Sequence, residues 1–310
     1  MDTKKLLRDL GNETRKLFPL FRYLLFQTET HAFCLALACA ALIAFYPFCV
    51  LLLSVIKHQL QWDAAYEVLL NTLRAFYPAA DDNTREFLIR NLQISIQFAG
   101  KRLQLGSIFW VFMGAAGIFI PLEAGLNRLW KVEQDRPYWL NQVVGLSLTA
   151  AGCALALAFV SLNAAIKFVV DLPFAVLGQL SDKFETIRTA IELLVLHLTA
   201  AAFFAIAIFM FYKFLPNRKV RAIQVLPAAI LAGIGSEIVK DVFKFLLPYM
   251  DIRDAQGSQG PFYVSISFVL LGYIETFVML GGAFLATHTE TYPWIGFIPR
   301  RRPSNPVSQV

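Results

Sequence analysis

Apolar residues in this chain are gathered into long, uninterrupted blocks, and this pattern restricts the possible folds more than any other feature of the sequence. About 20 consecutive apolar residues are what an α-helix needs to cross the hydrocarbon core of a bilayer. The chain is 57% hydrophobic and only 16% charged, whereas soluble domains carry about 25% charged residues. Because backbone within lipid must satisfy its own hydrogen bonds, the blocks predict a polytopic membrane protein built from helices.

Six blocks are long enough to be membrane spans, and no segment has the alternating pattern of a strand. The predicted spans are about 32–56, 105–122, 143–166, 191–212, 222–248 and 263–287. We therefore expect an all-α protein with six transmembrane helices and additional amphipathic helices at the membrane interface. The expected organisation is a cytoplasmic amphipathic segment at 1–30, a six-span membrane domain at 31–290 and a cytoplasmic tail at 291–310.

Three segments outside the spans are amphipathic. Residues 3–28 mix Lys and Arg with Leu and Phe, which is typical of a helix lying in the membrane interface but also of a tail packed on the bundle. Segments of about 62–76 and 82–99 are expected to form extracytoplasmic helices that lie on the membrane or cap the bundle. The first span contains Pro47 as an expected kink. It is longer than a signal-peptide core and lacks a small-residue cleavage site, so we expect no cleaved signal.

The basic residues between spans predict the orientation. Six spans place both termini on one side of the membrane. The short segment KFLPNRKVR (213–221) has four basic residues and no acidic one, which indicates a cytoplasmic loop. Both termini are therefore expected in the cytoplasm. The formal net charge of +6 comes from basic residues dispersed along such loops, so we expect no nucleic-acid partner.

Cysteine and histidine do not form the clusters that metal chemistry requires. The four cysteines lie within predicted spans and are expected to pack as small apolar residues. The four histidines are isolated, with no pair at metal-ligand spacing beside a carboxylate. A phosphate-binding glycine loop, a nucleophile elbow and an HExxH motif are also missing from the sequence. We therefore expect that the protein is not an enzyme and that it holds no metal ion or cofactor.

One face of the fifth predicted span is charged. Glu237, Lys240, Asp241 and Lys244 are spaced by three or four residues, so they share one helix face and can pair with each other. One charged side chain at the centre of an isolated span costs roughly 2.5–3.5 kcal/mol. This face should therefore point towards protein or a water-filled cavity.

Several short motifs, in order along the chain, resemble one family. They are Pro121 followed by Asn127-Arg128-Leu129-Trp130, Arg136-Pro137-Tyr138-Trp139, Leu215-Pro216-Asn217-Arg218, the span containing Lys240 and Phe243, and Gly281-Gly282-Ala283-Phe284-Leu285-Ala286. Over residues 20–287 they resemble the YihY/BrkB family of bacterial inner-membrane proteins. The chain departs from the family pattern at Phe284, where an acidic residue is usual, and around 259–263, where a Tyr-Gly element is usual.

The resemblance implies an inner-membrane protein linked to serum resistance and to movement of phospholipid or lipopolysaccharide. An older label for some members is ribonuclease BN, and the scattered histidines argue against that activity here. The predicted function is lipid handling, with membrane lipids as partners. A structural protein that binds other envelope proteins and a small-solute or ion transporter are the alternatives. A proton-coupled transporter would require Glu237 or Glu275.

Two interpretations of the charged face stay open. In the first, it is a structural ion-pair network whose lysines extend to the membrane interface. In the second, it lines a polar groove completed by Glu275 of the sixth span and by Glu123 at the end of the second. In such a groove Lys240 and Lys244 would hold a lipid phosphate, while Glu237, Asp241 and Glu275 would balance an ammonium group or the lysines.

Overall fold

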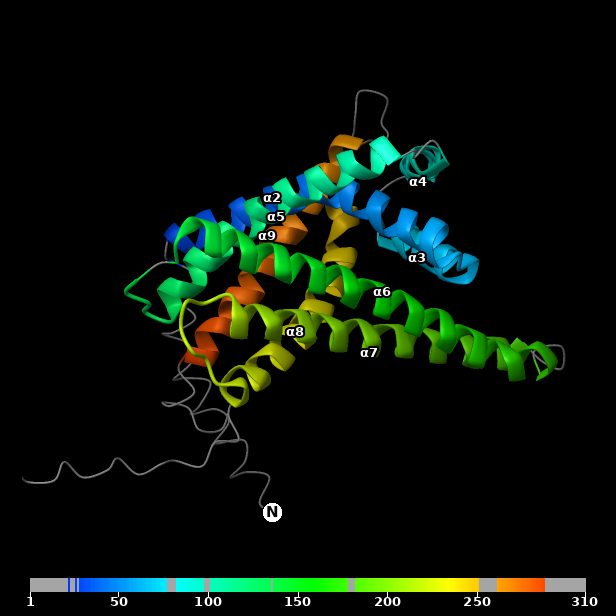
Figure 1. Cartoon of the computed structure of the whole chain (residues 1–310). Helices are drawn as coiled ribbons and strands as arrows, with labels where there is room; N and C mark the ends of the chain where they lie inside the picture. The colour runs from blue at the N-terminus through cyan, green and yellow to red at the C-terminus, as the bar shows by residue number, and fades with distance from the viewer. Residues whose placement is uncertain are drawn as a thin grey trace, which may run out of the picture.

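The protein is helical throughout the part of the chain that the computed structural model describes (Figure 1). The described residues are Arg22, Phe26, 28–76, 82–97, 101–134, 136–177, 182–250 and 261–287, and these ranges contain no strand. The prediction of an all-α fold is confirmed for them. The predicted tail at 291–310 and nearly all of the amphipathic segment at 1–30 lie outside the described residues.

The helices agree with the predicted segments, with longer bounds for several of them. They are α2 (Thr28–Ser54), η1 (Val55–Leu60), α3 (Asp63–Phe76), α4 (Asp82–Gln97), α5 (Lys101–Leu129), α6 (Tyr138–Leu177), α7 (Asp182–Phe214), α8 (Ala222–Leu246), η2 (Leu247–Tyr249) and α9 (Pro261–Thr287). Most of the predicted connection at 167–190 belongs to α6 and α7 rather than to a loop. The predicted kink residue Pro47 lies inside α2, which continues as a helix on both sides of it.

Five of the described helices are long and apolar enough to cross a membrane. They are Glu29–Leu60, Tyr138–Val169, Ile187–Phe214, Ala222–Leu246 and Tyr263–Thr287. The predicted second span, 105–122, lies within α5, and its crossing of the membrane stays a prediction. The protein is therefore a multi-pass membrane protein with at least five span-length helices.

Polar contacts bring the ends of the long helices together at one end of the bundle. The first turn of α2 meets the last turn of α5 through the ion pair between Glu29 and Arg128. The segment before α6 meets the segment after α7 through Arg136 and Asn217. Because the start of α2 meets the end of α5, and the start of α6 meets the end of α7, the helices of each of these pairs run in opposite directions (Figure 1).

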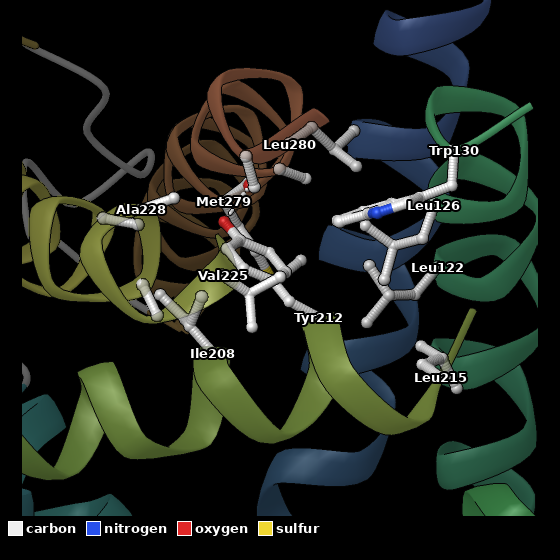
Figure 2. Packing of buried hydrophobic residues seen from close by; sticks show 14 of the residues in the cluster. Leu122, Leu126, Trp130, Ile208, Tyr212, Leu215, Val225, Ala228, Met279 and Leu280 are labelled. Atoms are coloured by element: carbon white, nitrogen blue, oxygen red, sulfur yellow. Dashed lines mark hydrogen bonds between the residues drawn. The ribbon is translucent and has the colours of Figure 1, made fainter. Parts of the chain in front are cut away.

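The largest core cluster joins α2, α5, α7, α8 and α9 around the side chain of Tyr212. Its hydroxyl group donates a hydrogen bond to the carbonyl oxygen of Met279 in α9, and its ring lies 6.0 Å from that of Trp130. Figure 2 shows Tyr212 extending from α7 between Val225 of α8 and the α5 side chains. A Cβ at Gly282 would lie 2.5 Å from the Tyr212 oxygen, so glycine there makes room for the hydroxyl group.

A second core cluster holds the α3–α4 hairpin onto the rest of the molecule. Its buried residues come from α2, η1, α3, α4 and α6, and include Leu53, Ile56, Leu70, Ile96 and Val160. The hydroxyl group of Tyr46 in α2 also lies 2.9 Å from that of Ser95 in α4. The predicted pair of amphipathic helices is therefore packed against the long helices, and its position relative to the membrane stays a prediction.

The outer face of α8 is a continuous apolar surface. Large exposed side chains recur at helical spacing along it: Ile223, Leu226, Ile230, Ile234, Ile238, Val242 and Phe245. The opposite side contributes Val225, Ala228, Ala229, Ala232 and Ser236 to the interior. An apolar stripe of this length is expected where a helix faces lipid, so the charged residues of α8 occupy a third face between lipid and core.

Candidate functional site

The four charged residues of α8 form two ion pairs along one face of the helix. Lys240 pairs with Glu237, and Lys244 Nζ lies 3.2 Å from Asp241 Oδ1. In both pairs the carboxylate precedes its lysine by three residues, which is the spacing that makes side chains neighbours on a helix. The Glu237–Lys240 pair is the more enclosed, with side-chain exposures of 15% and 24%.

Helix α7 faces this row and contributes two contacts to it. His197 Nε2 lies 3.6 Å from Asp241 Oδ1, and Lys240 Nζ lies 5.3 Å from the centre of the Phe204 ring. His197 Nδ1 lies 2.7 Å from the Leu193 carbonyl oxygen, so it carries the proton that is donated there. The sequence did not show that His197 lies near a carboxylate, because Asp241 is on a neighbouring helix.

Three of the four paired residues, Glu237, Lys240 and Lys244, line a cavity of about 450 Å³, and Asp241 is not part of its lining. Its walls come from α6, α7, α8 and α9, with Thr72 of α3 at one side. Most of the lining is apolar and includes Phe159, Phe203, Phe243 and Phe268, while the charged lining residues are Glu237, Lys240 and Lys244, joined by His197. The volume lies within the range of small-molecule sites, which also combine apolar walls with a few polar groups.

Glu275 of α9 lies beside this cavity and not on its lining. Its carboxyl group is next to the Ser236 hydroxyl group and within the electrostatic influence of Lys240 and Glu237. The structure therefore brings Glu275 to the charged face of α8 from the neighbouring helix. It stands behind the lining residues, where it adds a third carboxyl group to the surroundings of Lys240.

Glu123 lies elsewhere in the bundle. It is buried, with 4% exposure, on α5, which packs mainly against α2, α6 and α9. Glu123 is not among the residues that line the cavity, although the sequence placed it in the same groove. The position of a residue along a hydrophobic span indicates its depth in the membrane, but it does not indicate which helices become neighbours.

A polar junction at the opposite end of the bundle was not predicted as a site. Arg136 donates hydrogen bonds to the carbonyl oxygens of Phe214, Leu215 and Pro216, at 3.0–3.2 Å, and to Asn217 Oδ1. The backbone N–H of Asn217 in turn donates to Asn127 Oδ1 at 2.8 Å. Three of the family-like motifs meet here, and their Asn-Arg, Arg-Pro and Pro-Asn steps were the signal that could have identified it.

Within the described ranges, no three His, Cys, Asp or Glu side chains are grouped closely enough to hold a metal ion. All four cysteines are free, and Cys34 and Cys49 are buried. The chemistry of the cavity therefore comes from Glu237, Lys240, Lys244, His197 and the hydroxyl groups of its lining. These groups can bind charges of both signs and can donate or accept hydrogen bonds.

Comparison with known proteins assigns the chain to a group of membrane proteins. A family profile described as "Virulence factor BrkB" matches residues 27–295. Relatives named UPF0761 membrane protein include those of Nitrosospira multiformis, 25% identical over 72% of this chain and 53% of the relative, and of Xanthomonas campestris, 26% identical over 75% and 50%. The relative from Aliivibrio fischeri is 25% identical over 84% of this chain and 78% of its own length.

The chain spans about half the length of the Nitrosospira and Xanthomonas relatives. No solved structure matches this sequence.

Proposed function

Because the chain belongs to the virulence factor BrkB family of membrane proteins, we propose that it handles or transports lipid, as phospholipid or lipopolysaccharide, through the cavity beside α8. The observation that carries the proposal is the composition of that cavity. Aromatic and aliphatic side chains form most of its wall, and Glu237, Lys240 and Lys244 form a charged row along one side. A lipid has the same division between acyl chains and a charged headgroup.

Energetics support a ligand role for the row. Charged side chains within a membrane are expensive, and they are found where they face a cavity or a functional partner. Lys240 and Lys244 line the cavity, whereas the large side chains on the outer face of α8 are apolar. Their ammonium groups can bind phosphate oxygens by charge-assisted hydrogen bonds, while the phenylalanines of α6, α7 and α9 accommodate acyl chains.

The position of the cavity also fits lipid movement. It lies along the second half of α8 and the first third of α9, distant from the segments 130–137 and 214–221. If those basic segments are cytoplasmic, as their composition predicts, the cavity opens within the outer half of the bilayer. From the same basic segments we propose an inner-membrane location with both termini in the cytoplasm. We also propose a non-enzymatic role.

The test compares lipid movement in vesicles that contain the full chain or its variants. Fluorescent phospholipid placed in both leaflets is quenched from outside, and the accessible fraction reports transbilayer movement. Lys240→Ala with Lys244→Ala is expected to lower the rate about tenfold or more, because two charge-assisted contacts are lost. The matched control, Lys213→Ala with Lys219→Ala, removes two lysines at the other end of the bundle and should keep the wild-type rate.

Equal rates for both double variants, with intact folding shown by thermal unfolding, would refute the lipid-groove function.

A second function, partner binding, is favoured by one observation. Helix α4 exposes Phe87 and Ile94, at 57% and 41%, on the hairpin that packs onto the bundle. In that case Phe87→Ser with Ile94→Ser would impair envelope integrity in cells more than the lysine variants do. The reverse order of effects would leave lipid handling as the supported function.

A further inference from the structure

We propose that the cavity selects a zwitterionic headgroup that carries a phosphate and a primary ammonium, of the phosphoethanolamine type, over headgroups with net negative charge. The inference rests on the proposed function, because it requires that a lipid headgroup enters the cavity. It follows from how the charges of α8 are already balanced. Each lysine of the row has its own carboxylate: Glu237 for Lys240 and Asp241 for Lys244.

A purely anionic headgroup would disturb this balance. A phosphate that binds Lys240 competes with Glu237, whose side chain is only 15% exposed. The displaced carboxylate would then lie beside an anion in poorly hydrated surroundings, and leaving one member of an enclosed pair without a partner is strongly unfavourable.

A zwitterionic headgroup replaces both partners at once. Its phosphate binds the lysine, and its ammonium binds the carboxylate that the lysine has released. The carboxylate and lysine of each pair are three residues apart, a helix rise of about 4.5 Å. This step is on the scale of the two-carbon link between phosphate and amine in ethanolamine, so one headgroup can lie along one pair.

The ammonium is expected to be primary rather than trimethylated. Glu237 binds a cation by accepting hydrogen bonds, and a trimethylammonium has no N–H to donate. The ring of Phe204, which lies beside this pair, is already contacted by Lys240 Nζ at 5.3 Å and is therefore not free to bind a choline group. His197 Nε2, which points to Asp241, adds a further nitrogen that can accept from a primary ammonium when the imidazole is neutral.

The test measures which lipid the purified full chain retains. Protein in detergent is equilibrated with an equimolar mixture of phosphatidylethanolamine, phosphatidylglycerol and phosphatidylcholine with identical acyl chains, and bound lipid is counted by native mass spectrometry. The wild type is expected to retain phosphatidylethanolamine about fivefold or more over each of the others. Equal retention of the three lipids, or a preference for phosphatidylglycerol, would overturn the inference.

Variants then connect the preference to the pair. Glu237→Gln frees Lys240 and should shift the ratio about tenfold towards phosphatidylglycerol, because the wall gains a net positive charge. The matched control is Glu192→Gln, which removes a carboxylate paired with Arg188 on α7 at 3.2 Å and outside the cavity lining. It should leave the ratio unchanged, and equal shifts in the two variants would refute the role of the α8 pair.

Two further measurements distinguish an error in the headgroup selectivity from an error in the proposed function. Soluble glycerophosphoethanolamine should not displace bound lipid, because the apolar walls bind the acyl chains; efficient displacement would identify a free headgroup as the ligand and overturn the lipid source. Ala200→Trp fills the cavity and should abolish retention of every lipid. Retention that survives this variant would contradict the proposed function itself, whereas retention without headgroup preference would contradict only the selectivity.

Discussion

Arg136 joins two loops of the bundle with a single side chain. Its guanidinium group donates to the carbonyl oxygen of Phe214, the last residue of α7, to those of Leu215 and Pro216 after it, and to Asn217 Oδ1. The last carbonyl groups of a helix have no partner within it, so Arg136 also caps α7. Arg136 and Asn217 therefore hold the ends of the helices together, and neither lines the cavity.

Replacing Arg136 with Lys should therefore destabilise the protein although the charge is kept. One ammonium group cannot span acceptors that a planar guanidinium fork reaches together, and hydrogen bonds from charged groups contribute about 1.5–3 kcal/mol each. We expect a loss of about 2–3 kcal/mol in the free energy of unfolding, measured by thermal unfolding of the purified chain in detergent.

Arg218→Lys is the matched control for this prediction. Arg218 Nη1 donates a hydrogen bond to the Trp130 carbonyl oxygen at 3.2 Å. We expect Arg218→Lys to lower the free energy of unfolding by less than about 1 kcal/mol. Similar losses for the two variants would mean that the fork geometry of Arg136 does not matter.

At the same scale, the sequence predicted contacts within one helix and missed contacts between helices. The shared face of Glu237, Lys240, Asp241 and Lys244 follows from helical geometry alone, and both expected ion pairs are present. The contact between His197 and Asp241 depends on how α7 and α8 pack, which no local pattern specifies. The sequence could not locate Glu123 relative to the charged face of α8 for the same reason, since the neighbours of α5 are set by tertiary packing.

The packing of α7 against α8 depends on one glycine. A Cβ at Gly233 would lie 2.8 Å from Ala205 Cβ and 2.9 Å from the Ala201 carbonyl oxygen. Small residues at helix contacts allow such close approach in membranes, where van der Waals packing drives association. Because Ala200 and Phe204 on the same stretch of α7 line the cavity, this approach also sets the position of the cavity wall.

Gly233→Ala should push the two helices apart. Overpacking at a tight contact typically costs about 1–3 kcal/mol, and we expect a loss of this size in thermal unfolding together with weaker lipid retention. Gly106→Ala in α5 is the control, since a Cβ there would meet nothing within 4 Å. It should be neutral or slightly stabilising, and a loss equal to that of Gly233→Ala would show that helix contact is not the cause.

At the scale of elements, the apolar blocks of the sequence predicted the central part of each helix better than its ends. The predicted spans 143–166 and 191–212 lie inside α6 and α7, which extend to Leu177 and from Asp182. Hydropathy falls where a helix leaves the hydrocarbon, but helical hydrogen bonding continues in water or at an interface. The α3–α4 hairpin was located within two residues because amphipathic periodicity persists outside the membrane.

For the whole molecule, the two polar regions lie at different ends of the bundle and have different chemistry. The Arg136 junction consists of loop backbone tied by charge-assisted hydrogen bonds, and it neighbours the basic segment 213–221. The cavity is lined by helix side chains, most of them apolar, with Glu237, Lys240 and Lys244 on one side. The first arrangement stabilises the bundle, whereas the second can exchange its internal partners for those of a ligand.

The number of crossings decides on which side each region lies, and α5 is the helix whose crossing is in question. Asp63 is the first residue of α3, Glu133 follows α5, and Lys219 lies between α7 and α8; all three residues are exposed. If α5 crosses the membrane and the basic loops are cytoplasmic, Asp63 faces the outside while Glu133 and Lys219 face the cytoplasm.

Single cysteines at these positions, in a chain whose four native cysteines are replaced by alanine, test this arrangement. A membrane-impermeant maleimide should label Asp63→Cys in intact spheroplasts, and it should label Glu133→Cys and Lys219→Cys only after lysis. Labelling of Asp63→Cys and Glu133→Cys from the same side would show that α5 does not cross. A reversed pattern would place the Arg136 junction outside and the cavity in the inner leaflet, where a lipid could enter it directly from the cytoplasmic side.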